Sequence, residues 1–345
     1  MGLKDEIFEQ PAVLQHLLET QWDHIKEVAA ALKQQEIDYV FLAARGTSDH
    51  AGLYAKYLWG GTNRWPIALA APSLFSLYDQ PPRLRHALVV GISQSGQSPD
   101  IVGVLAEGRR QGQPTLAITN DATSPLAETA DYCLDIQAGV EQAVAATKTY
   151  TAQLLTIAML STALTGDAQR LDDLQHLPDL VRQVLQLDDR LQQAAERFRY
   201  MDQCVVLGRG YNYATAFEWS LKMKELSYVV AEPYSSADFR HGPIAIVAQG
   251  FPVMALAPDG LVFDDMLNLL QRLHDDHHAE LLVISNRQEA LDLARTPLTL
   301  PEVLPEWLSP LVSIVPAQLF CYYLTQTKGF DTEQPRGLQK VTKTH

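Results

Sequence analysis

The stretch HALVVGISQSGQSPD, residues 86–100, contains the strand, the loop and the helix start on which the fold depends. The unbroken apolar run from Ala87 to Ile92 is typical of a strand buried on both faces of a parallel sheet. The Ser/Gly-rich loop after it ends at Ser98, a residue type that often begins helices, and Pro99 suits the first helical position. The stretch therefore predicts a parallel α/β fold.

The loop at residues 93–98 has the chemistry of an anion site. Gly96 lets backbone amides approach a ligand closely, and a helix N-terminus offers N–H groups and a positive partial charge. The serine hydroxyls can donate to phosphate oxygens. The loop has neither the lysine of a Walker motif nor a G-x-G-x-x-G pattern, so nucleotide loops of those kinds are excluded. The residues alone leave two interpretations, a phosphate site and a solvated helix cap.

A second turn of the same kind, Arg45-Gly46-Thr47-Ser48, follows another apolar run. Here too the residues allow two interpretations. Thr47 and Ser48 can contact a ligand, or one of them can cap the helix that follows.

Strands and helices alternate along the chain, which is typical of a parallel sheet with crossover helices. Two halves of the sequence correspond in order: Arg45-Gly46 with Arg209-Gly210, Gly96 with Gly260, and residues 116–120 with 282–286. This internal repeat predicts a duplicated α/β domain. We expect strands at 39–44, 86–92, 115–119, 204–208, 251–256 and 281–285, and helices at 10–34, 50–58, 99–111 and 214–228.

The pattern also predicts how the chain is divided. The apolar run Leu154–Leu164 is too short to span a bilayer and predicts a buried helix. The expected parts are a helical segment (1–34), a first domain (35–165), a helical linker (166–198), a second domain (199–330) and a polar tail (331–345).

Composition limits the class of protein. With 345 residues, 47% of them hydrophobic, the chain can form sizeable cores, and its net charge of −14 argues against binding nucleic acid through phosphate neutralisation. Residues 1–12 are charged where a secretion signal would be apolar, so we expect a soluble, cytoplasmic protein without membrane association. Cys133, Cys204 and Cys321 lie far apart among apolar residues and predict three buried thiols in a reducing compartment.

Five segments together resemble one family. They are RGTSDHA (45–51), ISQSGQSPD (92–100), EQAVAATK (141–148), LKMKELSYVVAEPYSSADFRHGP (221–243) and DTEQPRGLQK (331–340). In this order they resemble the tandem sugar-isomerase (SIS) proteins, that is, the isomerase half of glucosamine-6-phosphate synthase and its stand-alone relatives, among them deaminases. The resemblance implies two tandem SIS domains, each a flavodoxin-like parallel sheet between helices, and a catalytic C-terminal tail.

The resemblance also implies roles for individual residues. Glu225 matches the base that moves a proton between C2 and C1 of the sugar, and Lys222, one turn earlier, would orient the substrate. Because the two are three residues apart, they share a helix face. His241 matches the group that opens the sugar ring, and Lys340 matches the lysine that forms a Schiff base with the ketose.

The remaining matched positions would bind the sugar phosphate. Ala146, where serine is common, and Gln339, where alanine is usual, depart from the family pattern near the sugar, so the identity of the sugar stays open. The expected binding residues are Thr47, Ser48, Ser93, Gln94, Ser95, Ser98, Val144 (through its backbone) and Gln339.

The resemblance implies conversion of glucosamine 6-phosphate to fructose 6-phosphate and ammonia, or the reverse. Gly2 is the second residue and no cysteine precedes Cys133, so we expect no glutaminase activity. The alternatives are an enzyme for another amino-sugar or sugar-amine phosphate, and a non-catalytic sugar-phosphate sensor. We expect a homodimer in which the histidine serves the partner's site, and no cofactor or metal, since His274 and His278 lack a third ligand.

Overall fold

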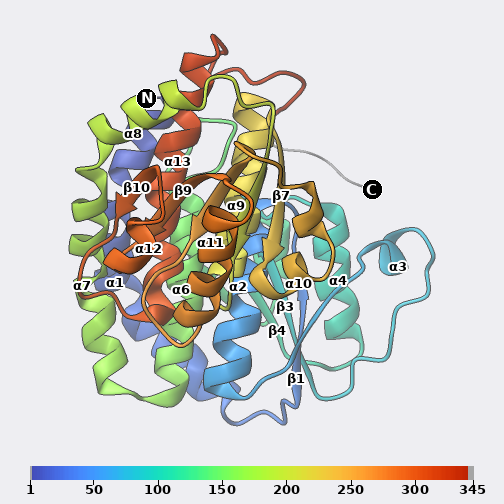
Figure 1. Ribbon diagram of the computed structural model, residues 1–345. Helices are drawn as coiled ribbons and strands as arrows, with labels where there is room; N and C mark the ends of the chain where they lie inside the picture. Colours follow the sequence, from blue (N-terminus) through green and yellow to red (C-terminus); the bar gives the residue numbers. More distant parts are fainter. Residues whose placement is uncertain (1, 341–345) are drawn as a thin grey trace. The chain divides into compact units, whose positions relative to one another are not determined.

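The computed structural model describes residues 2–340, which divide into two compact units (Figure 1). The N-terminal unit comprises residues 12–141 and 146–176 together with Gln339 and Lys340. The C-terminal unit comprises residues 2–11, 142–145 and 177–338.

The N-terminal unit is built on a five-stranded sheet in which every pair of neighbours is parallel. Its order, β2-β1-β3-β4-β5, is that of flavodoxin-like folds. All residues of the central strand β3 are buried, which explains its unbroken apolar run. The strands are β1 (Tyr39–Ala43), β2 (Ile67–Leu69), β3 (Ala87–Ser93), β4 (Thr115–Thr119) and β5 (Tyr132–Asp135).

Helices cross over between these strands. The predicted buried helix is confirmed as α6, in which Lys148 through Thr162 are all buried. The helices of this unit are α2 (Thr47–Leu58), the π-turn η1 (Trp59–Asn63), α3 (Ser73–Ser76), α4 (Pro99–Arg110), α5 (Pro125–Thr129) and α6 (Lys148–Thr165); α1 (Leu3–Leu32) and α7 (Ala168–Leu185) contribute residues to both units.

The sheet of the C-terminal unit repeats this topology. Its order is β10-β9-β8-β6-β7. Read in the opposite direction, with β6 in the place of β1, this is the order of the first sheet, and all its pairs are parallel. The predicted duplication of an α/β domain is therefore confirmed. The strands are β6 (Gln203–Gly208), β7 (Val230–Ser235), β8 (Pro252–Leu256), β9 (Glu280–Ser285) and β10 (Thr296–Thr299).

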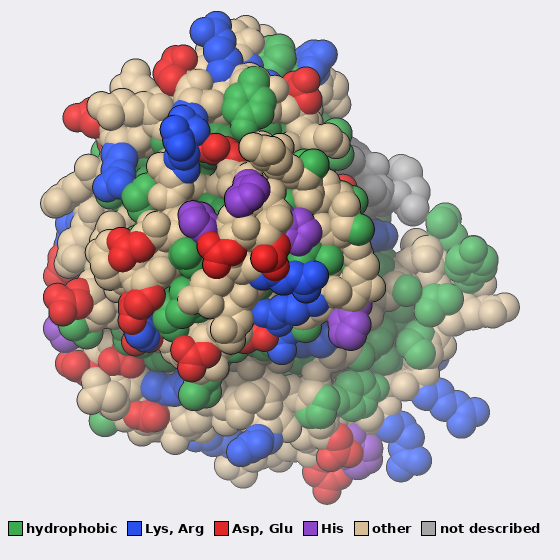
Figure 2. All heavy atoms as spheres, in the orientation of Figure 1, with side chains coloured by type: hydrophobic (Ala, Val, Ile, Leu, Met, Phe, Trp, Pro, Cys, Tyr) green, Lys and Arg blue, Asp and Glu red, His purple; other side chains and the backbone are tan. Residues whose placement is uncertain are grey.

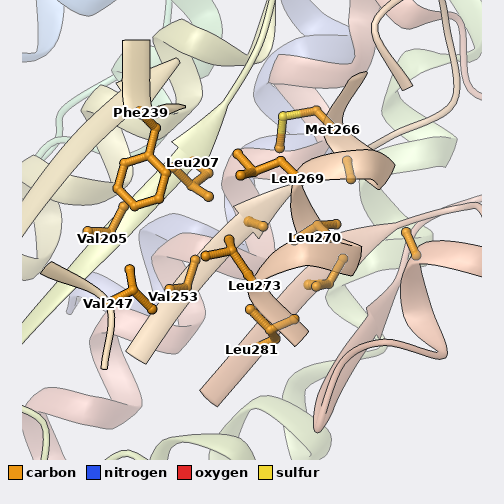
Figure 3. Packing of buried hydrophobic residues seen from close by; sticks show 14 of the residues in the cluster. Val205, Leu207, Phe239, Val247, Val253, Met266, Leu269, Leu270, Leu273 and Leu281 are labelled. Atoms are coloured by element: carbon orange, nitrogen blue, oxygen red, sulfur yellow. The ribbon is translucent and has the colours of Figure 1, made fainter. Parts of the chain in front are cut away.

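The core of this unit lies between its sheet and α11. Figure 3 shows Phe239 beside Leu207, and Leu273 of α11 near the strand residue Val253. The helices are α8 (Asp188–Arg197), α9 (Asn212–Lys222), the π-turn η2 (Met223–Ser227), α10 (Ser236–Arg240), η3 (Pro243–Ile246), α11 (Phe263–Asp275), α12 (Gln288–Leu291), η4 (Glu306–Leu308) and α13 (Ser309–Thr327).

One ion pair recurs at the same position in both units. Arg45, just after β1, contacts Asp100 in the first turn of α4, with 2.8 Å between Nε and Oδ2. Arg209, just after β6, lies 4.0 Å from Asp265 in the first turn of α11. In each unit the pair joins the loop after the first strand to the helix that follows the third strand.

Several expected boundaries were wrong. The first helix begins at Leu3 rather than near residue 10, because acidic residues in its first turn favour an earlier start. The helix α2 begins at Thr47 with Gly46 as its N-cap, so neither Thr47 nor Ser48 caps it.

The expectation of three buried thiols was wrong for Cys133, which is only half-buried on the edge strand β5. Partial burial and nearby carboxylates raise the pKa of this thiol to about 11.

One helical stretch, Glu306–Thr327, is long and apolar enough to cross a membrane. However, 94% of its most apolar window of 18 residues is buried inside the structure, as in the core helix of a globular unit. On the face shown in Figure 2, acidic and basic side chains are interspersed rather than gathered into a single basic patch.

Gly208 at the end of β6 allows α9 to approach closely, and this contact can be tested. A Cβ at this position would collide with the backbone carbonyl of Asn212. We expect Gly208→Ala to lower the free energy of unfolding by about 1–3 kcal/mol, measured by urea denaturation. Gly103→Ala is the matched control: it lies inside α4 with nothing near its Cβ, so it should stabilise by about 0.5–1 kcal/mol. Equal effects of the two changes would contradict the packing argument.

Candidate functional site

The residues expected to form the site are divided between the two units. The C-terminal unit holds Val144, Lys222, Glu225 and His241. The N-terminal unit holds the others, Thr47, Ser48, Ser93, Gln94, Ser95, Ser98, Gln339 and Lys340.

The loop between β3 and α4 folds back on itself through its own serines. The hydroxyl of Ser93 accepts the N–H of Gly96 at 3.1 Å, and the hydroxyl of Ser95 accepts the N–H of Gln97 at 3.3 Å. Gly96 has φ +62°, and a Cβ there would collide with Ser124. The position therefore requires glycine, which keeps the loop tight.

Ser98 is the N-cap of α4 and Pro99 its first residue, as predicted. Its hydroxyl makes no capping hydrogen bond, however, and has no partner among residues 2–340. The interpretation as a satisfied helix cap is therefore weakened. A half-buried hydroxyl at a helix N-terminus can instead donate to an anion.

The neighbouring turn after β1 contributes a second hydroxyl. Ser48 is buried and accepts a hydrogen bond from the amide nitrogen of Gln153 on α6 at 3.0 Å. The other amide atom of Gln153, Oε1, is buried without a partner among the described residues. Thr47, the first residue of α2, is half-buried.

The tail residues of this unit differ in exposure. Gln339 is exposed, whereas Lys340 is largely covered and its Nζ lies 2.6 Å from Oε2 of the buried Glu141. From the sequence, a lysine in a polar C-terminal tail would be expected to be solvated. The pairing of Lys340 with Glu141 is therefore a feature of the tertiary structure.

In the C-terminal unit, Lys222 and Glu225 form an ion pair with 2.5 Å between Nζ and Oε2. The side chain of Lys222 is 1% exposed and that of Glu225 is 24% exposed, so the carboxylate is open to a ligand while the amine is enclosed. Lys222 ends α9 and Glu225 lies in the π-turn η2, a departure from α-helix that is frequent at functional sites.

A third member of this cluster, Glu218, was missed by sequence reasoning. It is fully buried, and its Oε1 lies 3.4 Å from Nζ of Lys222. Burial alone would lower the pKa of Lys222, but the charges of Glu218 and Glu225 and the hydrogen bonds to both raise it above its usual range. The signal was present, since a Glu four residues before a Lys is an ion-pair spacing in a helix.

His241 lies just after α10 and its side chain is exposed. The preceding residue Arg240 is held by Asp265 at 2.6 Å, and Ser236 also donates to Asp265. These bonds fix α10, so the imidazole projects from an anchored turn. Among residues 2–340 the His241 ring makes no hydrogen bond or ion pair.

Val144 belongs to a segment held by the first helix. The buried carboxylate of Glu6 accepts the N–H groups of Gln142 and Ala143. The backbone of Val144 itself has no hydrogen-bond partner within residues 2–340, so it is available to a ligand.

The tail is attached to the end of the turn that carries Glu225. The guanidinium of Arg336 lies 3.7 Å from the ring centroid of Tyr228, and its backbone N–H donates to the Tyr228 hydroxyl at 2.8 Å. Glu333 accepts the N–H of Leu3 at 3.0 Å. These contacts attach residues 333–336 of the tail to the start of the first helix and to the residue that follows the π-turn η2.

The turn of the C-terminal unit that corresponds in sequence to the serine loop (93–98) is occupied by a side chain of the chain itself. Glu306 accepts the N–H of Leu261 at 3.1 Å and lies where a Cβ on Gly260 would be. A carboxylate of the chain thus occupies the position that an anion would take in the other unit.

The fold and the serine-lined loop define a class: proteins built from two tandem parallel α/β domains. The SIS domain family matches residues 35–163 and 198–328, so the chain belongs to the SIS-domain family. The resemblance drawn from the motifs is confirmed at this level.

The chain is also similar to larger proteins. It is 34% identical over 348 residues to the glutamine–fructose-6-phosphate aminotransferase (isomerizing) of Thermus thermophilus, covering 97% of this chain and 57% of the relative. The enzyme of that name from Thermococcus kodakarensis is 34% identical over 344 residues, with 97% and 56% coverage. The chain therefore spans little more than half the length of the curated relatives it matches.

Solved structures agree with this relationship. The C-terminal domain of glucosamine-fructose-6-phosphate aminotransferase from Francisella tularensis superposes with a TM-score of 0.86 at 30% identity, covering 96% of this chain and 98% of that one. Glucosamine-6-phosphate deaminase from Thermotoga maritima has a TM-score of 0.78 at 22% identity, with 99% coverage of both chains, and shows the shared fold.

The buried cluster around Lys222 predicts a large effect on stability. Lys222→Met leaves Glu218 buried without its cation, so we expect the free energy of unfolding at pH 7 to fall by about 3–5 kcal/mol. Because the pKa of Lys222 is raised above 10.5, its contribution is complete below pH 10.5 and is lost only as the pH rises through the folded-state value. Urea denaturation across pH checks both points.

Lys224→Met, an exposed neighbour in the same turn, is the control and should change stability by less than about 0.5 kcal/mol. A small loss for Lys222→Met, no larger than the loss for this control, would contradict the proposed role of the cluster.

Proposed function

We propose that this protein is a phosphosugar isomerase and deaminase that converts glucosamine 6-phosphate and water to fructose 6-phosphate and ammonia, or catalyses the reverse. The observation that carries the proposal is the Lys222–Glu225 pair, in which a partly open carboxylate is held by an enclosed ammonium. Moving a proton between adjacent carbons needs one base that reaches both, and a fixed carboxylate meets this need.

In the proposed reaction, His241 assists opening of the sugar ring, so that C1 becomes an aldehyde. Glu225 then takes the proton from C2 and returns it to C1, while a proton of the C2 amine moves to the oxygen on C1, which leaves a hydroxymethyl group at C1 and an imine at C2. Water adds to this imine and ammonia leaves, giving the ketose. In the reverse direction, Lys340 holds the ketose as a Schiff base at C2 before the base acts.

The phosphate needs no basic surface in this proposal. The serine loop before α4 offers hydroxyls, and the helix N-terminus offers amides and a positive partial charge. Support comes from the uncapped Ser98, and from Gly96, whose conformation draws the loop tight. This arrangement fits a chain whose net charge is −14.

A second candidate is an enzyme of the same type for a different amino-sugar or sugar-amine phosphate. The observation that favours it is the departure at Ala146 and at Gln339, because both positions adjoin residues assigned to the sugar. Stereochemistry at C4 and substituents on nitrogen are the features that would distinguish such substrates.

A panel of hexosamine 6-phosphates and fructosamine 6-phosphates tests the function, with ammonia release and ketose formation as readouts. We expect turnover of glucosamine 6-phosphate, and Glu225→Gln should lower kcat by about 10²- to 10⁴-fold with little change in substrate affinity. Glu232→Gln, an exposed carboxylate on β7, is the control and should retain full activity. Tight binding of a sugar phosphate without turnover of any panel member would favour a sensor instead.

We also propose that the protein acts as a homodimer with shared sites, in which His241 serves the partner's substrate. Glu225→Gln and His241→Ala are each expected to be inactive alone, since each lacks one required group. Mixed under conditions that exchange subunits, they should regain about one quarter of the wild-type activity if random hybrids carry one intact site. Exchange is verified by native mass spectrometry, and no recovery after proven exchange would rule out sharing.

A further inference from the structure

Glu141 is a buried carboxylate that the proposed reaction has not used. Its side chain is fully buried, in the middle of the segment that joins β5 to α6. Buried carboxylates are costly unless they are paired and hydrogen-bonded. Its contacts therefore need a functional or structural explanation.

Two threonines at the start of α6 hold the carboxylate. Its Oε1 accepts the N–H groups of Thr147 and Thr149 at 2.9 and 3.1 Å. The hydroxyl of Thr149 donates to Oε2 at 2.8 Å. The N-terminus of a helix of 18 residues thus supplies both fixed donors and a positive partial charge.

The second ligand of Oε2 is the ammonium of Lys340, 2.6 Å away and 199 positions along the chain. Burial alone would raise the pKa of Glu141, but the charge of Lys340, its hydrogen bond and those of the threonines lower it below its usual range. The carboxylate is therefore ionised at neutral pH and is a poor acceptor for a proton from Lys340.

An ordinary ion pair does not account for this arrangement. Exposed pairs contribute little, whereas here one partner is fully enclosed and is also held by two threonines. Gln94 of the phosphate loop and Glu141 also line the same cavity of about 690 Å³. Residue 141 and the loop at residues 93–98 therefore border the same space.

We propose that Glu141 is the positioning residue and counter-ion of Lys340 during Schiff-base formation, an inference that rests on the proposed function. In this step one proton of the Lys340 ammonium passes to the C2 carbonyl oxygen of a ketose phosphate as the freed amine attacks C2, and the resulting carbinolamine loses water to give a protonated imine. One N–C bond forms, the C–O bond breaks, and two protons of the ammonium leave with the oxygen as water. Ammonium and protonated imine each carry one positive charge, so Glu141 stays ionised and balances both.

The test is reductive trapping of the imine on the full chain with fructose 6-phosphate and borohydride, located at Lys340 by mass spectrometry. We expect Glu141→Gln to slow formation of the adduct by about 10- to 100-fold. Affinity for glucitol 6-phosphate, which lacks a carbonyl, should change by less than about twofold, because positioning of the lysine is separate from phosphate binding. A residue that only maintained the fold would affect both measurements.

Asp135→Asn is the matched control, because Asp135 lines the same cavity, and trapping should continue at the wild-type rate. Lys340→Arg keeps the charge and should give no adduct. If thermal unfolding shows that Glu141→Gln is not folded, Glu141→Asp, which keeps the charge but is one methylene shorter, replaces it and should also slow trapping.

Trapping at the wild-type rate in the folded Glu141 variant would overturn the counter-ion role and leave the proposed function intact. Absence of any adduct in the wild type during active turnover would overturn both the counter-ion role and the Schiff-base part of the proposed function. Loss of turnover on the whole sugar panel, with trapping still present and sensitive to Glu141, would refute only the deaminase assignment.

Discussion

Parallel pairing of every strand is the constraint on which the rest of this structure depends. Parallel neighbours need a crossover, so each central strand leads through a short loop into a helix N-terminus at the same edge of its sheet. The helix N-termini at this edge carry free N–H groups and a positive partial charge, which favour the binding of anions. The two units meet this situation differently: the serine loop of one is open, and the matching turn of the other is filled by the chain's own Glu306. Duplication of the domain thus leaves one loop of this kind open.

Buried charge is the second theme. In each unit a fully enclosed ionic group is held by several partners: Lys222 lies between two glutamates, and Glu141 between two threonines and a lysine. In both cases the partner group, Glu225 or Lys340, is the one more open to solvent. An enclosed ion that orients a more accessible one is a way to present a reactive side chain in a fixed position without exposing the whole pair.

The sequence predicted the central strands and failed at the sheet edges. All six expected strands exist, and they are the three inner strands of each sheet. The four that were missed, β2, β5, β7 and β10, are the edge strands, which are short or partly exposed and carry no continuous apolar run. Pattern detects burial on two faces more readily than burial on one.

For the candidate site, the sequence by itself determined the family, the loop chemistry and the Lys222–Glu225 spacing, because local periodicity and turn residues encode these directly. Only the tertiary structure decided the partners that come from afar. Glu141 reaches Lys340 across 199 positions, and Arg45 reaches Asp100 across 55, neither of which follows from local pattern. Glu218 is an intermediate case: its spacing of four residues from Lys222 can be seen in the sequence, but its burial cannot. Burial depends on which faces pack together, and that is a property of the folded chain.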